Sequence, residues 1–114
     1  MFNEERQRLL EELKKKSRSS VLIIEGKKDK AKLESLNIHA EFFLLCKQNR
    51  SIPESAEKIS EKYKEAILML DQDKQGKKME KMFIQYLQKF GVKVNNRIGK
   101  RLLYLANSST VEGI

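Results

Sequence analysis

Short, continuously apolar runs recur along the chain and are separated by longer stretches of mixed character. They fall within residues 19–24, 40–45 and 66–70, and none of them alternates polar with apolar positions. Such runs are typical of strands that are covered on both faces, and a shorter strand is predicted at 92–94.

Apolar residues spaced three or four positions apart predict helices around these strands. The first helix is expected at residues 3–16, where Leu9, Leu10 and Leu13 form a narrow apolar stripe and the last turn is basic. Two further helices are indicated by weaker spacing, one marked by Leu33 and Leu36 and one by Ile98, Leu102, Leu105 and Ala106.

Two helices carry clearer start and stop signals. Ser51 is a suitable cap for a helix that begins near Pro53, because serine accepts hydrogen bonds from the first turn and proline suits that turn. The strongest helical periodicity begins at Lys74, and Gly91 is placed to end it. We expect its apolar stripe to be buried, including Met79, Met82 and Phe83.

The alternation of buried strands and helices predicts the fold class. It is an α/β fold, with three α/β/α layers around a mainly parallel four-stranded sheet. A chain of 114 residues, of which 39% are hydrophobic, can bury one modest core. We therefore expect a single domain at 19–114, with an N-terminal helical segment at 1–18 packed on it.

The charge balance points to a polyanionic partner. Lysine and arginine number 24 against 16 aspartates and glutamates, which gives a net charge of +8. Such a balance favours binding to nucleic acid, either DNA or RNA. A protein partner or a homo-oligomer remains open.

The cysteine and histidine content limits the metal chemistry. Cys46 is the only cysteine, so it has no partner for a disulfide within the chain, and we expect it to pack as a small buried residue at the end of a strand. His39 is the only histidine, which excludes a zinc site of soft ligands within one chain. No N-terminal stretch has the apolar character of a signal peptide or membrane span, so we expect a cytoplasmic protein without membrane association.

Two carboxylates end the third apolar run, in the stretch AILMLDQDKQG at residues 66–76. Asp71 and Asp73 lie two positions apart on an extended segment, so their side chains project to the same side. Like charges held together require a shared proton or a cation, and a hard divalent cation such as magnesium prefers carboxylate oxygens. Glu25 follows the first strand and would join them if the first and third strands are neighbours in a 2-1-3 order.

Other acidic and phosphate-binding motifs fit less well. A calcium-binding loop starting at Asp71 would place Met82 where a glutamate is required, and a strand precedes it where a helix should be. Neither EGKKDK nor QGKKME has the spacing of a phosphate-binding P-loop. A phosphatase with an aspartate nucleophile also carries Asp-x-Asp after a strand, but that interpretation leaves Glu25 without a function.

The pair of motifs, EGKKD after the first strand and DQDKQG after the third, resembles the Toprim domain. This domain is shared by primases, topoisomerases, OLD-family nucleases, recombination-mediator proteins and a ribosomal-RNA maturation nuclease, and small stand-alone forms occur in archaea and bacteria. The resemblance, over about residues 19–106, implies a Toprim-like fold with Glu25 as general acid or base and with Asp71 and Asp73 as magnesium ligands. Asp29 matches a second acidic position of the first motif, and Gly26 and Gly76 match the glycines. Primase and topoisomerase activities need elements from other domains that this chain lacks.

Basic residues flank both acidic motifs and could contact phosphates. We assign Lys28 to stabilising charge that develops during catalysis. The residues expected to contact phosphate or nucleic acid are Gly26, Lys27, Asp29, Lys74, Gly76 and Lys77. We interpret Arg97, Lys100 and Arg101 as a solvated face, and Tyr63, Tyr86 and Tyr104 as core or surface residues.

The sequence thus predicts magnesium-dependent phosphodiester chemistry on nucleic acid, as in a nuclease or RNA-processing factor. In this hypothesis Glu25 moves the proton, and the metal is held by Glu25, Asp71 and Asp73. The alternative is a non-catalytic Toprim module that binds nucleic acid or nucleotide within a larger assembly.

Overall fold

The computed structural model describes residues 2–114, and Met1, the first residue of the predicted N-terminal segment, lies outside this range. Within it, the sheet consists of β1 (Val21–Ile24), β2 (Glu41–Leu44), β3 (Glu65–Leu68) and β4 (Lys93–Asn95). The helices are α1 (Phe2–Lys16), α2 (Lys27–Ser35), α3 (Ile52–Lys62), α4 (Lys74–Lys89) and α5 (Arg97–Leu105), with short 3-10 turns η1 (Leu45–Lys47) and η2 (Val111–Gly113).

The strands lie in the order β2-β1-β3-β4, and each adjacent pair is parallel. Ile23 of β1 pairs with Phe43 of β2 on one side and with Leu68 of β3 on the other. The predicted α/β class and the parallel sheet are therefore confirmed, and the observed order meets the condition under which Glu25 and Asp71 come together.

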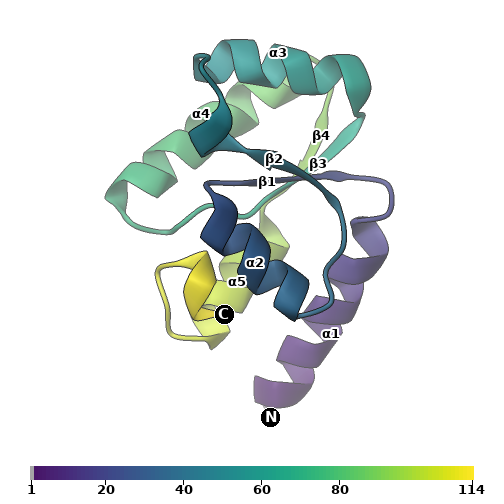
Figure 1. Cartoon of the computed structure of the whole chain (residues 1–114), viewed down its shortest axis with the longest axis vertical. Helices are drawn as coiled ribbons and strands as arrows, with labels where there is room; N and C mark the ends of the chain where they lie inside the picture. Colours follow the sequence, from purple (N-terminus) through teal and green to yellow (C-terminus); the bar gives the residue numbers. More distant parts are fainter. Residues whose placement is uncertain (1) are drawn as a thin grey trace.

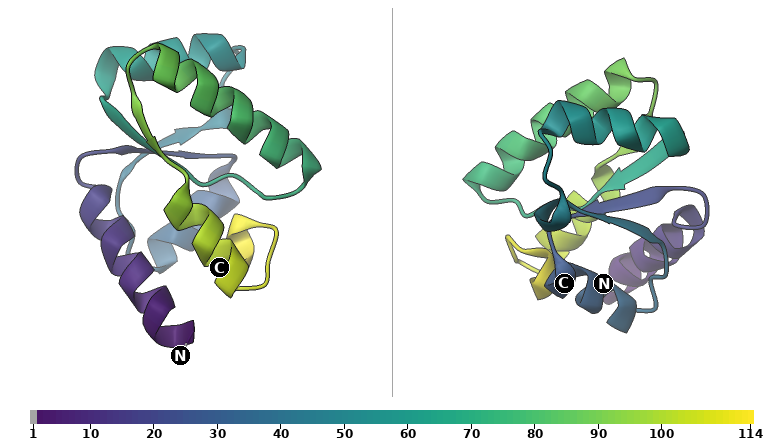
Figure 2. Two further views of the ribbon diagram at one scale, coloured as in Figure 1. Left: turned by 180° about the vertical axis from the view of Figure 1, so that it is seen from behind. Right: turned by 45° about the horizontal axis from the view of Figure 1, so that its top comes forward.

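Helices cover both faces of the sheet and form three layers (Figure 1). Helices α3 and α4 lie on one face, and α1, α2 and α5 lie on the other, as the two further views confirm (Figure 2). Side chains of β1 alternate between the faces: Leu22 and Ile24 pack with Leu13 of α1, whereas Ile23 packs with Phe83 of α4. This two-sided burial explains why the strand sequence is continuously apolar.

Two predicted helix boundaries are confirmed, the start of α3 by its capping interactions and the end of α4 by the backbone conformation of Gly91. The Ser51 hydroxyl accepts a hydrogen bond from the Glu54 N–H at 3.3 Å, and the Ser51 N–H donates to the Glu54 carboxylate at 3.2 Å. Gly91 follows α4 with φ of 83°, a left-handed conformation that glycine adopts without strain.

Three predictions about buried residues were wrong. The strand predicted at 40–45 to be covered on both faces is β2 at the edge of the sheet, where Glu41 is exposed and the following three residues are only partly buried. Cys46 is exposed, because β2 ends at Leu44 and the chain turns into η1 at the surface. Met82 is 38% exposed, because the buried stripe of α4 is centred on Phe83 and Leu87 and Met82 lies at its flank.

No helix within residues 2–114 has both the length and the apolar character needed to cross a bilayer.

Candidate metal and phosphate site

The parallel order of β1 and β3 brings two acidic segments to the same edge of the sheet. Glu25 directly follows β1, and the pairing continues beyond β3 through a hydrogen bond of 3.0 Å from the Met69 N–H to the Ile23 carbonyl. Asp71 comes two residues later. Because the carboxyl ends of parallel strands share one edge, Glu25 and Asp71 lie next to each other at the point where the chain order reverses.

A shallow depression of about 410 Å³ lies at this edge. Its lining comes from the turn after β1, the first turn of α2, η1, the loop after β3 and η2. The lining residues are Glu25, Gly26, Lys27, Lys28, Asp29, Cys46, Asp71 and Glu112.

The pKa values of two carboxyl groups at this edge, those of Glu25 and Asp29, are raised. Burial raises the pKa of Glu25 to about 7, with contributions from a hydrogen bond with the Asp71 carboxyl and from the charges of Asp71, Asp29 and Asp73. Burial also raises the pKa of Asp29, against the opposing effect of a hydrogen bond from the Gly26 N–H. Negative charge at this edge is therefore not fully balanced by the protein.

Each aspartate also accepts a backbone hydrogen bond that holds it in place. Asp29 is 6% exposed and accepts from the Gly26 N–H at 3.1 Å. Asp73 caps α4 by accepting from the Gly76 N–H at 2.7 Å. Asp71 accepts from the Val111 N–H at 3.0 Å, which ties it to η2. The acidic groups are thus positioned by helix caps and by the C-terminal turn.

The donor chemistry of this edge suits magnesium, although the side chains are only partly gathered. Glu25 and Asp71 bring carboxylate oxygens together, which are the ligands that magnesium prefers. Among the residues that the structure describes, no three histidine, cysteine, aspartate or glutamate side chains are grouped as a metal site. Asp73, the third predicted ligand, uses its Oδ1 in the cap of α4 and does not line the depression.

The remaining predicted residues divide between the depression and the start of α4. Lys27 and Lys28 are exposed at the depression, whereas Lys74 and Lys77 are exposed on α4 outside its lining. The two glycines differ in their surroundings. A Cβ on Gly76 would lie 2.0 Å from the Asp71 carbonyl oxygen, whereas a Cβ on Gly26 would lie 3.6 Å from the Cys46 Sγ. Gly76 therefore allows α4 to start close to the Asp71 backbone.

Three residues at this edge were not identified from the sequence. Glu112 and Cys46 line the depression, and the Gln72 N–H donates to the Ser109 carbonyl at 2.7 Å, which fixes the loop between the two aspartates. Two apolar residues near the C-terminus, Val111 and Ile114, were the available sequence signal that this segment packs on the core. Both are buried in the structure, with exposures of 0% and 7%. No local pattern indicated that it packs beside Asp71.

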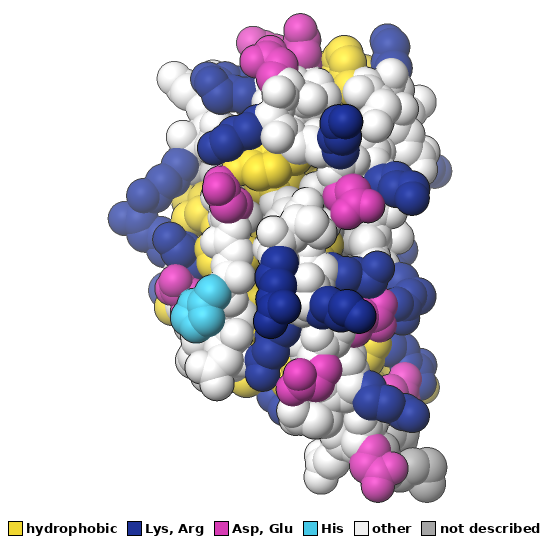
Figure 3. Space-filling view, turned by 90° about the vertical axis from the view of Figure 1, so that its right-hand side faces the viewer, with side chains coloured by type: hydrophobic (Ala, Val, Ile, Leu, Met, Phe, Trp, Pro, Cys, Tyr) yellow, Lys and Arg dark blue, Asp and Glu magenta, His cyan; other side chains and the backbone are white. Residues whose placement is uncertain are grey.

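The basic charge does not by itself mark the candidate site. Figure 3 shows the side of the molecule that is on the right in Figure 1, and there lysines and arginines are interspersed with acidic residues.

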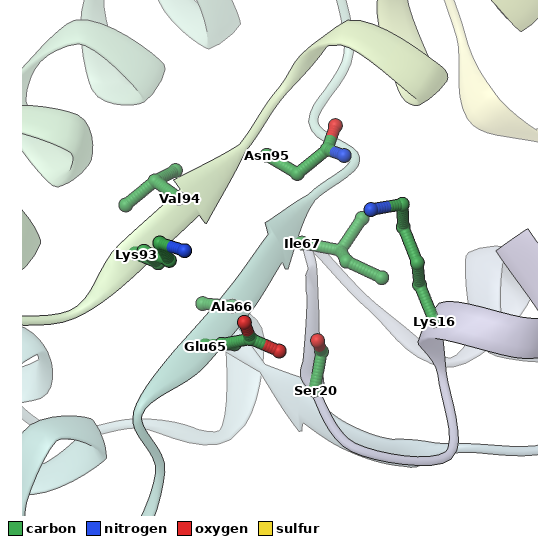
Figure 4. A pocket seen from close by; sticks show the side chains of 8 residues that line it. All are labelled: Lys16, Ser20, Glu65, Ala66, Ile67, Lys93, Val94 and Asn95. Atoms are coloured by element: carbon green, nitrogen blue, oxygen red, sulfur yellow. The ribbon is translucent and has the colours of Figure 1, made fainter.

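A second depression lies over β3 and β4, and its lining side chains come from the end of α1, the segment before β1 and the two strands (Figure 4). Glu65 is the one carboxylate among them.

Comparisons with known proteins point to one family. Residues 20–101 match the Toprim domain. The chain is 31% identical over 100 residues to a UPF0292 protein of Methanocaldococcus jannaschii, covering 88% of this chain and 77% of that protein. It is 31% identical over 87 residues to a UPF0292 protein of Thermoplasma volcanium, covering 76% and 72%. A solved structure of a putative protein from Aquifex aeolicus superimposes with a TM-score of 0.79 at 26% identity, covering 95% of this chain and 96% of that chain.

Proposed function

The chain belongs to the Toprim domain family, and from this premise we propose that it is a magnesium-dependent enzyme acting on phosphodiester bonds of nucleic acid, as a nuclease or RNA-processing factor. Membership of the family indicates a metal-dependent function on nucleic acid. The observation that carries the finer proposal is the meeting of Glu25 and Asp71 at the carboxyl edge of two adjacent parallel strands.

Glu25 and Asp71, together with Asp73, would hold the magnesium ion. When bound, magnesium supplies Lewis acidity, which polarises a phosphate oxygen and lowers the pKa of bound water. Without a bound cation, burial and the neighbouring carboxyl groups raise the pKa of Glu25 to about 7. A magnesium ion at this edge would lower that pKa, so Glu25 would be ionised at neutral pH and could accept a proton there. The exposed lysines of the first turn of α2, Lys27 and Lys28, would hold the phosphate and stabilise its developing charge.

The rival function is a non-catalytic module that binds nucleic acid or nucleotide through the same edge. It is favoured by the backbone hydrogen bonds of Asp29, Asp71 and Asp73, since each of these carboxylates already stabilises the fold. In such a module the acidic groups would position loops, and the lysines would supply the affinity.

Incubation with labelled nucleic acids separates the two functions. The purified protein is incubated with single- and double-stranded DNA and RNA, with magnesium or with chelator. The variants are Glu25→Gln and Asp71→Asn, and Glu65→Gln is the matched control, because it removes a carboxylate from the depression over β3 and β4.

If the protein is the proposed enzyme, it should cleave a nucleic acid only when magnesium is present. Cleavage should be abolished in Glu25→Gln and Asp71→Asn and retained in Glu65→Gln. Salt-sensitive binding without cleavage of any substrate would instead establish the module. Hydrolysis of a small phosphomonoester that is lost in Asp71→Asn but kept in Glu25→Gln would overturn both in favour of a phosphatase with an aspartate nucleophile.

A further inference from the structure

A groove between α4 and α5 opens beside the candidate site. It has a volume of about 400 Å³, and its walls come from α4, from α5 and from the loop between Asp71 and Asp73. Seen from behind, that loop runs between the two helices (Figure 2, left). The groove therefore leads away from the carboxylate edge. The residues that line it are Gln72, Lys77, Glu80, Lys81, Ile84 and Lys100.

A buried carboxylate holds the groove together. Glu80 is 3% exposed, and its Oε2 lies 3.7 Å from the Lys100 Nζ and 3.4 Å from the Gln72 Nε2. Because a buried carboxylate is costly without partners, these contacts fix Lys100 of α5 and the Gln72 loop relative to α4. Gln72 also donates to the Leu70 carbonyl at 3.1 Å. The wall that carries Lys100 is thus preorganised.

The groove keeps an excess of positive charge. Lys77 and Lys81 are exposed and lie four residues apart, on the same face of α4. Lys100 pairs with Glu80 but remains half exposed. Three lysines against one buried glutamate form a surface that suits successive phosphate groups.

The exposed face of α5 continues this surface beyond Lys100. Asn96, Arg97, Lys100, Arg101 and Tyr104 line a shallow depression next to the groove. Tyr104 is 68% exposed, the most exposed of the large hydrophobic side chains that the structure describes. The Arg101 guanidinium lies 4.9 Å from the centre of its ring, and Arg101 is itself held by Glu5 of α1. The Tyr104 ring is therefore accessible to solvent and is held in position by a cation–π contact with Arg101.

We propose that the α4–α5 groove and Tyr104 form a binding path for single-stranded nucleic acid, in which Lys77, Lys81 and Lys100 contact phosphates and Tyr104 stacks on a base. An exposed aromatic ring beside a basic groove is the arrangement that binds single strands, because stacking requires a base free of its complement. The path rests on the proposed function in one respect: single-stranded nucleic acid would be the substrate that it leads to the carboxylate edge.

Binding is measured by fluorescence anisotropy with a labelled oligonucleotide, as a single strand and as a duplex, in chelator so that no cleavage occurs. Tyr104→Ala removes the ring and Tyr104→Phe keeps it. Lys81→Gln removes one groove charge, and Lys58→Gln removes one exposed charge from α3, outside the groove.

Tyr104→Ala should weaken single-strand binding about tenfold, as expected for one lost stacking contact, while Tyr104→Phe stays within about twofold of the unmodified protein. Duplex binding should be unchanged in both. Lys81→Gln should lower the slope of log affinity against log salt by about 0.7 for the single strand, whereas Lys58→Gln leaves it unchanged.

The path is refuted if Tyr104→Ala binds the single strand as tightly as the unmodified protein, if the duplex suffers an equal loss, or if Lys58→Gln has the same effect as Lys81→Gln. The assay is independent of catalysis. A protein that cleaves nothing but shows the expected losses retains the path and refutes the proposed enzyme, and a protein that cleaves without these losses refutes the path alone.

Discussion

Replacing Gly76 by alanine tests the close approach of α4 to the loop after β3. Gly76 lies in the first turn of α4, and its N–H donates to the Asp73 carboxylate. A Cβ at this position would lie 2.0 Å from the Asp71 carbonyl oxygen and 2.8 Å from its carbon. Both atoms belong to the backbone, so neither a side-chain rotation nor a small adjustment relieves the contact.

The two opposing contributions can be compared. Alanine is favoured over glycine inside a helix by about 0.5–1 kcal/mol, so Gly76→Ala would stabilise a helix without this contact. Forcing an atom into a filled space costs typically about 1–3 kcal/mol, and a clash with backbone belongs at the upper end of that range. We therefore expect Gly76→Ala to lower the free energy of unfolding by about 2 kcal/mol, or the melting temperature by about 8 °C.

Urea and thermal denaturation, followed by circular dichroism, measure this change. Gly26→Ala is the matched control, because a Cβ there would make an ordinary contact of 3.6 Å with the Cys46 Sγ, and the φ of −157° is open to any residue. Alanine is a poorer helix cap than glycine, but it also restricts the unfolded chain, so the control should change stability by less than about 0.5 kcal/mol.

The outcome that refutes the reasoning is equal stability of the two alanine variants. It would mean that α4 and the Asp71 loop can separate at little cost, and the Asp71 backbone would then not be held by α4. If Gly76→Ala is destabilised as expected, magnesium titration calorimetry should also show weaker uptake, because the displaced loop carries the Asp71 carboxylate.

The remaining predictions concern single side chains of the same edge. In chelator, the free energy of unfolding should fall as the pH rises from 4.5 to 7, because the folded protein holds the Glu25 proton more tightly than the unfolded chain does. The expected fall is about 1–2 kcal/mol once the partial exposure of Glu25 is taken into account. Urea titrations of Glu25→Gln should show a smaller fall, and an unchanged one would refute this assignment. Asp73→Ala should lose about 1 kcal/mol of stability with the cap of α4, whereas Asp73→Asn should keep it, because asparagine caps as well as aspartate. Calorimetry should show weakened magnesium uptake in both Asp73 variants, and full uptake in Asp73→Asn would remove it from the ligand set. Val111→Ala should cost about 2 kcal/mol in urea denaturation, because the side chain is fully buried, while the exposed Glu112→Gln should not change stability measurably.

The secondary structure and the parallel arrangement of the strands were predictable because they depend on local patterns. The continuously apolar runs identified the strands, of which β1 and β3 are buried on both faces while the edge strand β2 is only partly buried, and their alternation with helices indicated a parallel sheet. In a parallel sheet the residues after each strand share one edge, so the pattern placed Glu25 and Asp71 on the same edge. The direct pairing of β1 with β3, which makes them neighbours there, came from the structure. The cap at Ser51 and the stop at Gly91 were equally local.

Other features of the edge depend on segments that are distant along the chain. Cys46 is exposed because η1 turns away from the core, which a run of apolar residues ending at Leu45 does not reveal. Glu80 falls on the buried face of a helix, where its charge is accommodated by Lys100 and Gln72 from other elements. The sequence predicted that Glu80 lies in a helix, but it did not identify the residues whose contacts allow Glu80 to be buried.

By itself, the sequence determined which residues follow the central strands, and therefore which acidic groups share an edge, because a continuous run of apolar residues indicates a buried strand. Only the tertiary structure decided how those groups are held. The C-terminal turn at Val111 binds Asp71 from 40 residues away, and Gly76 is confined by the Asp71 backbone while Gly26 is not. These contacts arise from the packing of separate elements, and no periodicity within one element encodes them.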